Sequence, residues 1–261
     1  MLTEHTVAAA ASAAGLLAPV HFVEVTGSTN TDLWTMAKGG APEWTLVVAG
    51  RQEAGRGRLG RTWVSAPGAS LHVSLLLRPR LGPSDAPLLS LAAAVAMVIG
   101  CRQAGRIDVG CKWPNDLIAG NRKLGGVLTE ASVQGTRLEF LIIGSGVNVS
   151  QRVEDFPEGL RDTATSVARE GGANDASGIL EGYLENLHDV YGDGGQAIGS
   201  RVLEPYRRSC RTIGRRVRAI TLGGREVDGV ARGIGDRGEL IVQTETGSER
   251  VGFGEIRHLE V

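Results

Sequence analysis

The segment between residues 51 and 61 carries charges suited to holding an anion. Four arginines, Arg51, Arg56, Arg58 and Arg61, are interleaved with glycines and opposed by one acid, Glu53. Glycine lets backbone N–H groups approach an anion closely, and guanidinium groups bind phosphate or carboxylate oxygens in pairs. We therefore predict a loop that closes on a polyanion. A solvated Arg-rich loop has the same composition, and the segment by itself does not separate a nucleotide from RNA.

Within this segment, residues 55–60 read Gly-Arg-Gly-Arg-Leu-Gly and so match the dinucleotide pattern GxGxxG. That pattern requires a helix directly after the glycines and an acidic residue about 20 positions further on. Residues 61–67 instead read Arg-Thr-Trp-Val-Ser-Ala-Pro, and position 80 is Arg. The Rossmann interpretation fails, and so does a P-loop, because GxxxxGK[ST] does not occur.

Two further segments place a lysine beside chemically active neighbours. Residues 112–116 read Lys-Trp-Pro-Asn-Asp, and residues 123–126 read Lys-Leu-Gly-Gly. Only three of the 28 basic residues are lysines, namely Lys38, Lys112 and Lys123. Since Arg serves at ordinary surface positions, a retained Lys is informative, and the glycines after Lys123 allow a strand to pass close to a ligand. Taken singly, the first segment also fits a bare turn, and Lys123 also fits a solvated lysine.

Two polar clusters flank these segments. Gly27-Ser28-Thr29-Asn30 groups two hydroxyls and an amide at a predicted helix start, where most such clusters are N-caps. Residues 144–149, Gly-Ser-Gly-Val-Asn-Val, alternate glycines at a strand end, which suits either a bend or a flat ligand. No HExxH, metal-spaced Cys/His set or GxSxG elbow occurs, so we expect neither a protein-bound metal nor Ser-hydrolase chemistry.

Hydrophobic periodicity predicts the elements that position these segments. We expect helices at residues 7–18, 28–38 (capped by Ser28 or Asn30), 88–99 and 176–191, and strands at 21–25, 45–49, 71–77 and 138–143. Strands near 109–112 and 123–130 are expected to pair through a turn at 119–121. The long segment 50–70 is predicted to be a functional loop. Short β runs after Ile213 predict a small separate β-barrel.

Composition limits the remaining classes. The chain has 261 residues and a formal net charge of −1, so global charge favours neither a nucleic-acid nor a membrane partner. The three cysteines form no CxxC pair, the N-terminus lacks a basic leader, and the longest apolar run, residues 88–99, is shorter than a membrane span. We expect a cytoplasmic protein.

The five segments in this order, GSTN, RQEAGRGRLGRTW, KWPND, RKLGG and GSGVNV, resemble the biotin protein ligases from about Thr26 to Val149. The tail resembles their C-terminal SH3-like domain more loosely. The resemblance implies an α/β (α+β) fold: a class II synthetase-like catalytic domain with a mixed or antiparallel sheet at 1–211, and an SH3-like domain at 212–261. It also implies two reactions. Biotin attacks the α-phosphate of ATP to give biotinyl-5′-AMP, and a lysine of a biotin carboxyl carrier domain of an acetyl- or acyl-CoA carboxylase then takes the biotinyl group.

The resemblance also assigns roles to residues. Lys123 and Arg58 are expected to act on the carboxylate and α-phosphate, and Asp116 is expected to receive the incoming lysine. Ser28, Thr29 and Gln52 would hold the biotin ring, and Arg56 to Arg58 would cover biotin and the phosphates. Mg²⁺ would arrive with ATP, held largely by phosphates and water. The full expected binding set is Ser28, Thr29, Asn30, Gln52, Gly55, Arg56, Gly57, Arg58, Arg61, Trp63, Lys112, Asn115, Lys123, Gly125, Gly126 and Asn148.

Two alternatives stay open, one a related enzyme and one a non-enzyme. A lipoate–protein ligase shares the fold and an analogous lysine, and a non-catalytic RNA-binding protein fits the loop arginines and the seven arginines between Arg201 and Arg218. Because 26 residues precede Gly27, too few for a winged helix, we expect a monofunctional ligase that does not bind DNA. Its oligomeric state stays open between monomer and homodimer.

Overall fold

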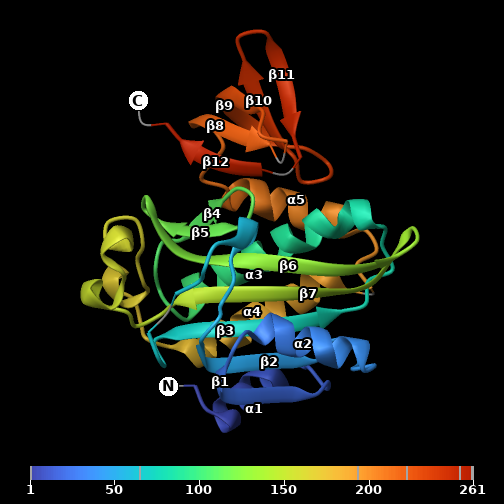
Figure 1. The fold of residues 1–261 in the computed structure, drawn as a ribbon, viewed down its shortest axis with the longest axis vertical. Helices are drawn as coiled ribbons and strands as arrows, with labels where there is room; N and C mark the ends of the chain where they lie inside the picture. Colours follow the sequence, from blue (N-terminus) through green and yellow to red (C-terminus); the bar gives the residue numbers. More distant parts are fainter. Residues whose placement is uncertain (1, 65, 193, 222, 253, 260–261) are drawn as a thin grey trace.

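The computed structural model describes residues 2–64, 66–192, 194–221, 223–252 and 254–259. It contains a large mixed α/β unit and, at the C-terminal end, a small β unit (Figure 1). The expected combination of an α/β unit with a mixed sheet and a β unit after Ile213 is therefore confirmed.

The large unit is built on a seven-stranded sheet in the order β1-β2-β3-β7-β6-β5-β4. Its strands β1 and β2 are parallel, and every other neighbouring pair is antiparallel. Long antiparallel pairing between β6 and β7 joins Gly126 to Gly146 and Leu128 to Gly144, so two of the predicted segments lie side by side. The strands are β1 (Val20–Thr26), β2 (Leu46–Gln52), β3 (Ser70–Leu77), β4 (Gly110–Lys112), β5 (Asp116–Ala119), β6 (Arg122–Gln134) and β7 (Arg137–Asn148).

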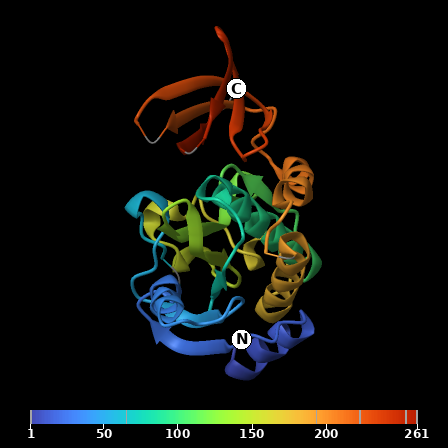
Figure 2. The same cartoon turned by 90° about the vertical axis from the view of Figure 1, so that its right-hand side faces the viewer.

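Helices cover both faces of this sheet. One face carries α2 (Thr29–Lys38), whose Leu33 and Ala37 pack on Val47, Leu76 and Ile142. The other face carries α1 (Glu4–Ala13), α3 (Ala86–Gln103) and α4 (Ala176–Tyr191), with α5 (Ile198–Ser209) leading to the small unit (Figure 2). The start of α2 therefore lies on the same sheet face as Gly126 of β6 and its pairing partner Gly146 of β7.

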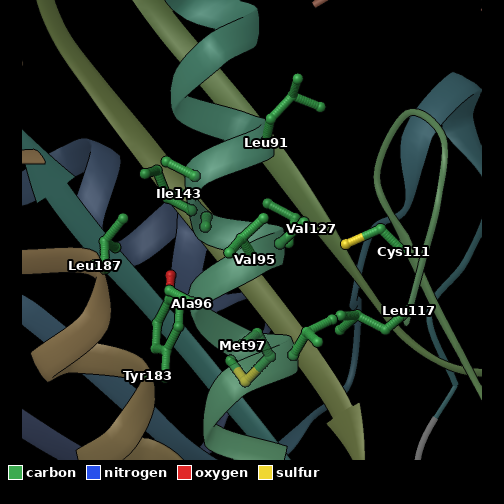
Figure 3. Close-up of a cluster of buried hydrophobic side chains, with 14 of the residues drawn as sticks. Leu91, Val95, Ala96, Met97, Cys111, Leu117, Val127, Ile143, Tyr183 and Leu187 are labelled. Atoms are coloured by element: carbon green, nitrogen blue, oxygen red, sulfur yellow. The ribbon is translucent and has the colours of Figure 1, made fainter. Parts of the chain in front are cut away.

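The core helix is α3, which is apolar on every side because every side is covered. Its residues Val95 and Met97 belong to one buried cluster with the sheet residues Val127 and Ile143 and with Tyr183 of α4 (Figure 3). Within the described residues, Pro83–Gln103 is the one helical stretch long and apolar enough to span a membrane, and 72% of its most apolar window is buried inside the protein. We therefore assign α3 to the core.

The small unit is an antiparallel sheet in the order β11-β10-β9-β8-β12. The indole Nε1–H of Trp113 donates to the Gly238 carbonyl at 2.8 Å, and the Trp113 N–H donates to Thr212 Oγ1 at 3.0 Å. The two units are thus joined at the Lys-Trp-Pro-Asn-Asp segment. The strands are β8 (Arg216–Thr221), β9 (Glu226–Ile234), β10 (Leu240–Thr244), β11 (Gly247–Val251) and β12 (Gly254–His258).

Three expectations about elements need correction. Residues 109–112 and 123–130 do not pair with each other, because β5 lies between them and pairs with both. The first helix spans residues 4–13 instead of 7–18, since Thr3 caps it. The helix α5 was not predicted; it contains Pro205, and its amphipathic residues Val202 and Tyr206 supply the buried face.

Candidate active site

A cavity of about 330 Å³ opens on the sheet face that carries α2. Side chains alternate along a strand, so Gly126 and Leu128 of β6 and Gly144 and Gly146 of β7 point to this face. The absence of side chains at these glycines lets Asn30 approach Gly144 and the Trp63 ring approach Gly146. The cavity gathers all of the expected site residues except two: Ser28, Thr29, Asn30, Gln52, Arg56, Gly57, Arg58, Arg61, Trp63, Lys112, Asn115, Asp116, Lys123, Gly126 and Asn148.

The two exceptions are glycines that pack beside the cavity. A Cβ on Gly125 would meet the Gly146 carbonyl and come within 3.0 Å of Leu117 Cδ1. A Cβ on Gly55 would lie 2.8 Å from the Trp63 carbonyl, and the Gly55 carbonyl accepts from the Trp63 N–H at 2.9 Å. Gly125 therefore permits close strand pairing, and Gly55 permits the loop to fold back on itself.

One end of the cavity is polar and uncharged. Gln52 Oε1 accepts from the N–H and the hydroxyl of Thr29, at 2.9 and 3.0 Å. Ser74 Oγ, which the sequence analysis did not single out, lies 2.7 Å from Thr29 Oγ1 and 2.6 Å from Asn30 Oδ1. Ser28 occupies the N-cap position of α2, yet its side chain makes no capping bond. The segment is therefore more than a plain helix cap: Ser28, Thr29 and Asn30 are buried against the cavity.

The Arg-rich loop covers the cavity and is fastened on both sides. Arg56 Nη2 pairs with Glu130 Oε2 of β6 at 3.0 Å. Arg58 donates to Asn115 Oδ1 at 3.0 Å and to the Gly254 carbonyl of β12 at 3.2 Å. Arg61 forms an ion pair with Glu255 of β12. The small β unit therefore contributes directly to the cavity wall through Gly254, Glu255 and Ile256.

A pair of oppositely charged groups lies under this loop. Lys123 Nζ is 2.7 Å from Asp116 Oδ1 and 6.0 Å from the centre of the Trp63 ring. The backbone of Lys123 is held by Thr163 and Thr165, whose carbonyl and N–H bond to it at 2.7 and 2.8 Å. Segments far apart in sequence thus position the lysine.

Burial lowers the pKa of two further cations. It lowers the pKa of the Lys112 ammonium, against the attraction of Asp116. It likewise lowers the pKa of the Arg58 guanidinium, and Asp116 again opposes the shift. On the opposing carboxylate, the hydrogen bond from Arg61 lowers the pKa of Glu255. A half-buried excess of positive charge stabilises an anion placed between these groups.

Another end of the cavity, beside Lys123, is lined by apolar side chains. Phe156, Leu160 and Ala164 line it from a segment after β7 that the sequence analysis did not assign. Asn148 borders this end; its amide donates to the Thr165 carbonyl at 2.9 Å and accepts from Gln151 at 3.2 Å. Among the described residues, the Trp63 Nε1–H is a buried donor without a partner.

The functional contacts that sequence reasoning missed come from outside the five motifs. Glu130, Ser74 and Glu255 look like ordinary strand residues, and Phe156 lies in an irregular segment. A weak signal existed for Glu130 alone: it follows Gly126 and Leu128 at the two-residue spacing of one strand face.

Comparison with known proteins agrees with this geometry. Residues 22–148 match the family model described as the biotin/lipoate A/B protein ligase family, and residues 212–259 match the biotin protein ligase C terminal domain. The bifunctional ligase/repressor BirA of Bacillus subtilis is 38% identical over 232 residues, covering 87% of this chain and 70% of that protein. The biotin–[acetyl-CoA-carboxylase] ligase of Mycobacterium tuberculosis is 35% identical over 248 residues, covering 91% and 88%.

A solved structure is similar to this chain in fold. The biotin protein ligase from Aquifex aeolicus in complex with biotin and ATP superimposes with a TM-score of 0.74 at 26% identity, covering 92% of this chain and 99% of that one. With the motifs gathered around one cavity, a matching C-terminal unit and relatives similar over most of their length, the chain belongs to the biotin protein ligases of the biotin/lipoate A/B protein ligase family.

Proposed function

We propose that this chain is an ATP-dependent, AMP-forming biotin protein ligase. It activates biotin to biotinyl-5′-AMP with release of pyrophosphate and transfers the biotinyl group to a lysine of a biotin carboxyl carrier domain. The observation that carries the proposal is that uncharged polar side chains, a group of cations and a set of apolar side chains line one cavity. These three environments match the ring, the phosphate and the adenine of biotinyl-AMP.

The polar end suits the biotin ring. A ureido group has one carbonyl acceptor and two N–H donors, and it carries no charge. The side chains of Ser28, Thr29, Asn30 and Gln52 supply uncharged donors and acceptors at this end. Gly144 and Gly146 lack side chains, which lets Asn30 and Trp63 lie close to β7 as parts of the cavity wall.

The central cations suit the activation step. The biotin carboxylate oxygen must attack the α-phosphorus while the bond to the pyrophosphate oxygen breaks, which brings several negative charges together. Lys123, Arg58 and Lys112 surround this region and offset the repulsion without reorganising during the reaction. Lys123 is held by its backbone and by Asp116, so its ammonium is already in place.

The apolar end suits the adenine. Phe156, Leu160 and Ala164 present a surface against which a flat base excludes water. Asn148 at its border has one amide N–H beyond the one that bonds to Thr165, and it can donate this N–H to a ribose or phosphate oxygen. This end takes the nucleotide, and the polar end takes biotin.

Asp116 serves the second step. A carrier lysine arrives as an ammonium, because its ordinary pKa is about 10.4, and it must lose a proton before its nitrogen attacks the biotinyl carbonyl carbon. The Asp116 carboxylate lines the cavity beside Lys123 and accepts that proton. When the amide forms, the second proton of the nitrogen passes to water, and AMP leaves with the electrons of the broken C–O bond.

Mg²⁺ fits this site as a companion of ATP. The cavity carboxylates Asp116 and Glu255 are already paired with Lys123 and Arg61. Within the described ranges, no group of three or more His, Cys, Asp and Glu side chains is placed to hold a metal. Phosphate oxygens and water would therefore hold the ion, which neutralises phosphate charge when bound.

The finer assignments are part of the same proposal. We place the protein in the cytoplasm, in keeping with free buried thiols at Cys101, Cys111 and Cys210, and its acceptor in an acetyl- or acyl-CoA carboxylase. The domain boundary is placed near residue 212, between α5 and β8. In the described residues ahead of β1 there is one helix, α1, whose Val7 and Ala10 are buried in the core, so we propose that this part of the chain reads no operator DNA.

A single experiment tests the function. The protein is mixed with ATP, Mg²⁺ and a biotin carboxyl carrier domain, and either biotin or lipoate is added. Mass spectrometry is expected to show one biotinyl group on the carrier in the biotin arm and none without ATP. Lipoyl transfer instead of biotinyl transfer would identify a lipoate ligase, and no transfer together with salt-sensitive RNA binding would favour the non-enzyme.

A further inference from the structure

Glu130 lies at the junction of three elements that enclose the polar end of the cavity. Its Oε2 accepts from Asn30 Nδ2 at 2.7 Å and from Arg56 Nη2 at 3.0 Å. Asn30 is the second residue of α2, Arg56 belongs to the loop over the cavity, and Glu130 is on β6. One carboxylate oxygen of β6 therefore contacts both the start of α2 and the Arg-rich loop over the polar end.

The contact with Asn30 sets the polarity of the neighbouring hydrogen bonds. A carboxylate only accepts, so the Asn30 amide must direct its NH₂ group to Glu130 and its oxygen to Ser74. The position is tight, because a Cβ on Gly144 would collide with the Asn30 amide. Asn30 is buried, and an inverted amide there would leave donors and acceptors unmatched.

The contact with Arg56 fastens the loop at this end. The other fastenings, Arg58 on Asn115 and Gly254 and Arg61 on Glu255, lie toward the small β unit. In the described part of the chain, Glu130 is the one carboxylate that forms an ion pair with Arg56. Its side chain is 26% exposed and that of Arg56 is 49% exposed, so water screens the pair in part.

We propose that Glu130 is a positioning residue for the ligase reaction: it latches the Arg-rich loop over the polar end of the cavity through Arg56 and orients Asn30 beneath it. The inference rests on the proposed function only for the identity of the ligand, biotin. The latch itself consists only of contacts between side chains of this chain. Glu130 does not touch the reacting atoms, so its loss weakens retention of the ligand and leaves the chemical step in place.

The test compares Glu130→Gln with Glu139→Gln. Glu139 is an exposed glutamate on the neighbouring strand β7, and its Oε2 accepts a hydrogen bond from Ser132 Oγ at 2.8 Å. Trypsin cleavage in the loop of the ligand-free protein is followed first. We expect Glu130→Gln to speed cleavage at the loop arginines about 5-fold and Glu139→Gln to leave it unchanged, with equal melting temperatures confirming that both variants are folded.

Ligand retention is measured next. Dissociation of radiolabelled biotin and its KM are expected to rise about 5-fold in Glu130→Gln, with kcat at saturating biotin within 2-fold of wild type. Because the effect passes largely through Arg56, Glu130→Gln is expected to add less than 2-fold in an Arg56→Gln background. A purely structural role would shift kcat, or would add in full to the Arg56 variant.

The outcomes separate the two proposals. If wild type binds no biotin, the proposed function fails, and loop cleavage still tests the latch. If wild type binds biotin and Glu130→Gln neither speeds cleavage nor raises the dissociation rate, or if the two substitutions add fully, the latch is refuted.

Discussion

Replacing Lys123 by arginine keeps the charge and changes the shape of the cation. The lysine stem passes over Gly126, where a Cβ would lie 3.6 Å from Lys123 Cε, and its Nζ meets Asp116 Oδ1 at 2.7 Å. A planar guanidinium binds a carboxylate through two parallel hydrogen bonds. We expect the arginine to lock onto Asp116 and to withhold its charge from the carboxylate and the α-phosphate.

The magnitude follows from the electrostatics. Two unit charges about 4 Å apart attract by about 4 kcal/mol at an effective dielectric constant of about 20. Loss of one preorganised contact of this kind costs roughly 10²–10³ in rate, about 2.7–4 kcal/mol. The Lys123 side chain is 41% exposed, so screening by water places the expected loss at the lower end, about 100-fold.

The assay is biotin-dependent release of pyrophosphate, with thermal melting to confirm folding. Lys38→Arg is the matched control, because Lys38 is exposed at the end of α2 and lies 5.8 Å from the Trp34 ring, away from the cavity. Lys38→Arg is expected to keep wild-type release. A folded Lys123→Arg protein with near-normal release would refute the assignment, and Lys112 would be the next candidate.

Three further predictions concern the loop, the pH dependence and the glycines. Biotin plus ATP should suppress trypsin cleavage near Gly55–Gly60, and equal cleavage with and without ligands would contradict a closing loop. Burial, with Lys112 and Arg215 nearby, lowers the pKa of His258 to about 4 in the folded protein, so between pH 6.5 and 4 the unfolded chain binds one more proton than the folded one. The contribution of His258 to stability is therefore full above pH 6.5 and falls toward pH 4. Replacing it, in His258→Gln, should lessen the drop in melting temperature between pH 7 and 5. Gly125→Ala pushes β6 away from β7 and should lower the free energy of unfolding, measured in urea, by about 1–3 kcal/mol. In Gly126→Ala the new Cβ would lie 3.4 Å from Asp116 Oδ1, so this variant should lose more pyrophosphate release than stability. A similar loss of stability in both glycine variants would contradict that distinction.

The sequence by itself was enough to find most of the cavity. Arginines and glycines in one loop, a lysine kept beside glycines, and alternating glycines on a strand are local patterns, because each reports what its own backbone needs near a ligand. Their order along the chain identified the family. Strand and helix periodicity likewise predicted most of the elements, since an element that buries one face has apolar residues at its own period along the sequence.

Pairing between distant residues was decided only in the tertiary structure. β5 lies between the two strands that were expected to pair, because the chain turns at residues 113–115 after β4 and again at 120–121 before β6. Gly254 and Glu255 of the small β unit bind the arginines of the loop, and no motif in the sequence of that unit predicts these contacts.

The partners of the motif side chains were likewise hidden. Glu130, Ser74 and Phe156 acquire their roles because a sheet face, a helix start and a loop meet around one cavity. A single glutamate on a strand looks the same whether it faces solvent, as Glu139 does, or holds an arginine over a ligand site. Motif residues are recognisable by type because the ligand chemistry restricts them, whereas the residues that hold them in place are restricted only by three-dimensional proximity.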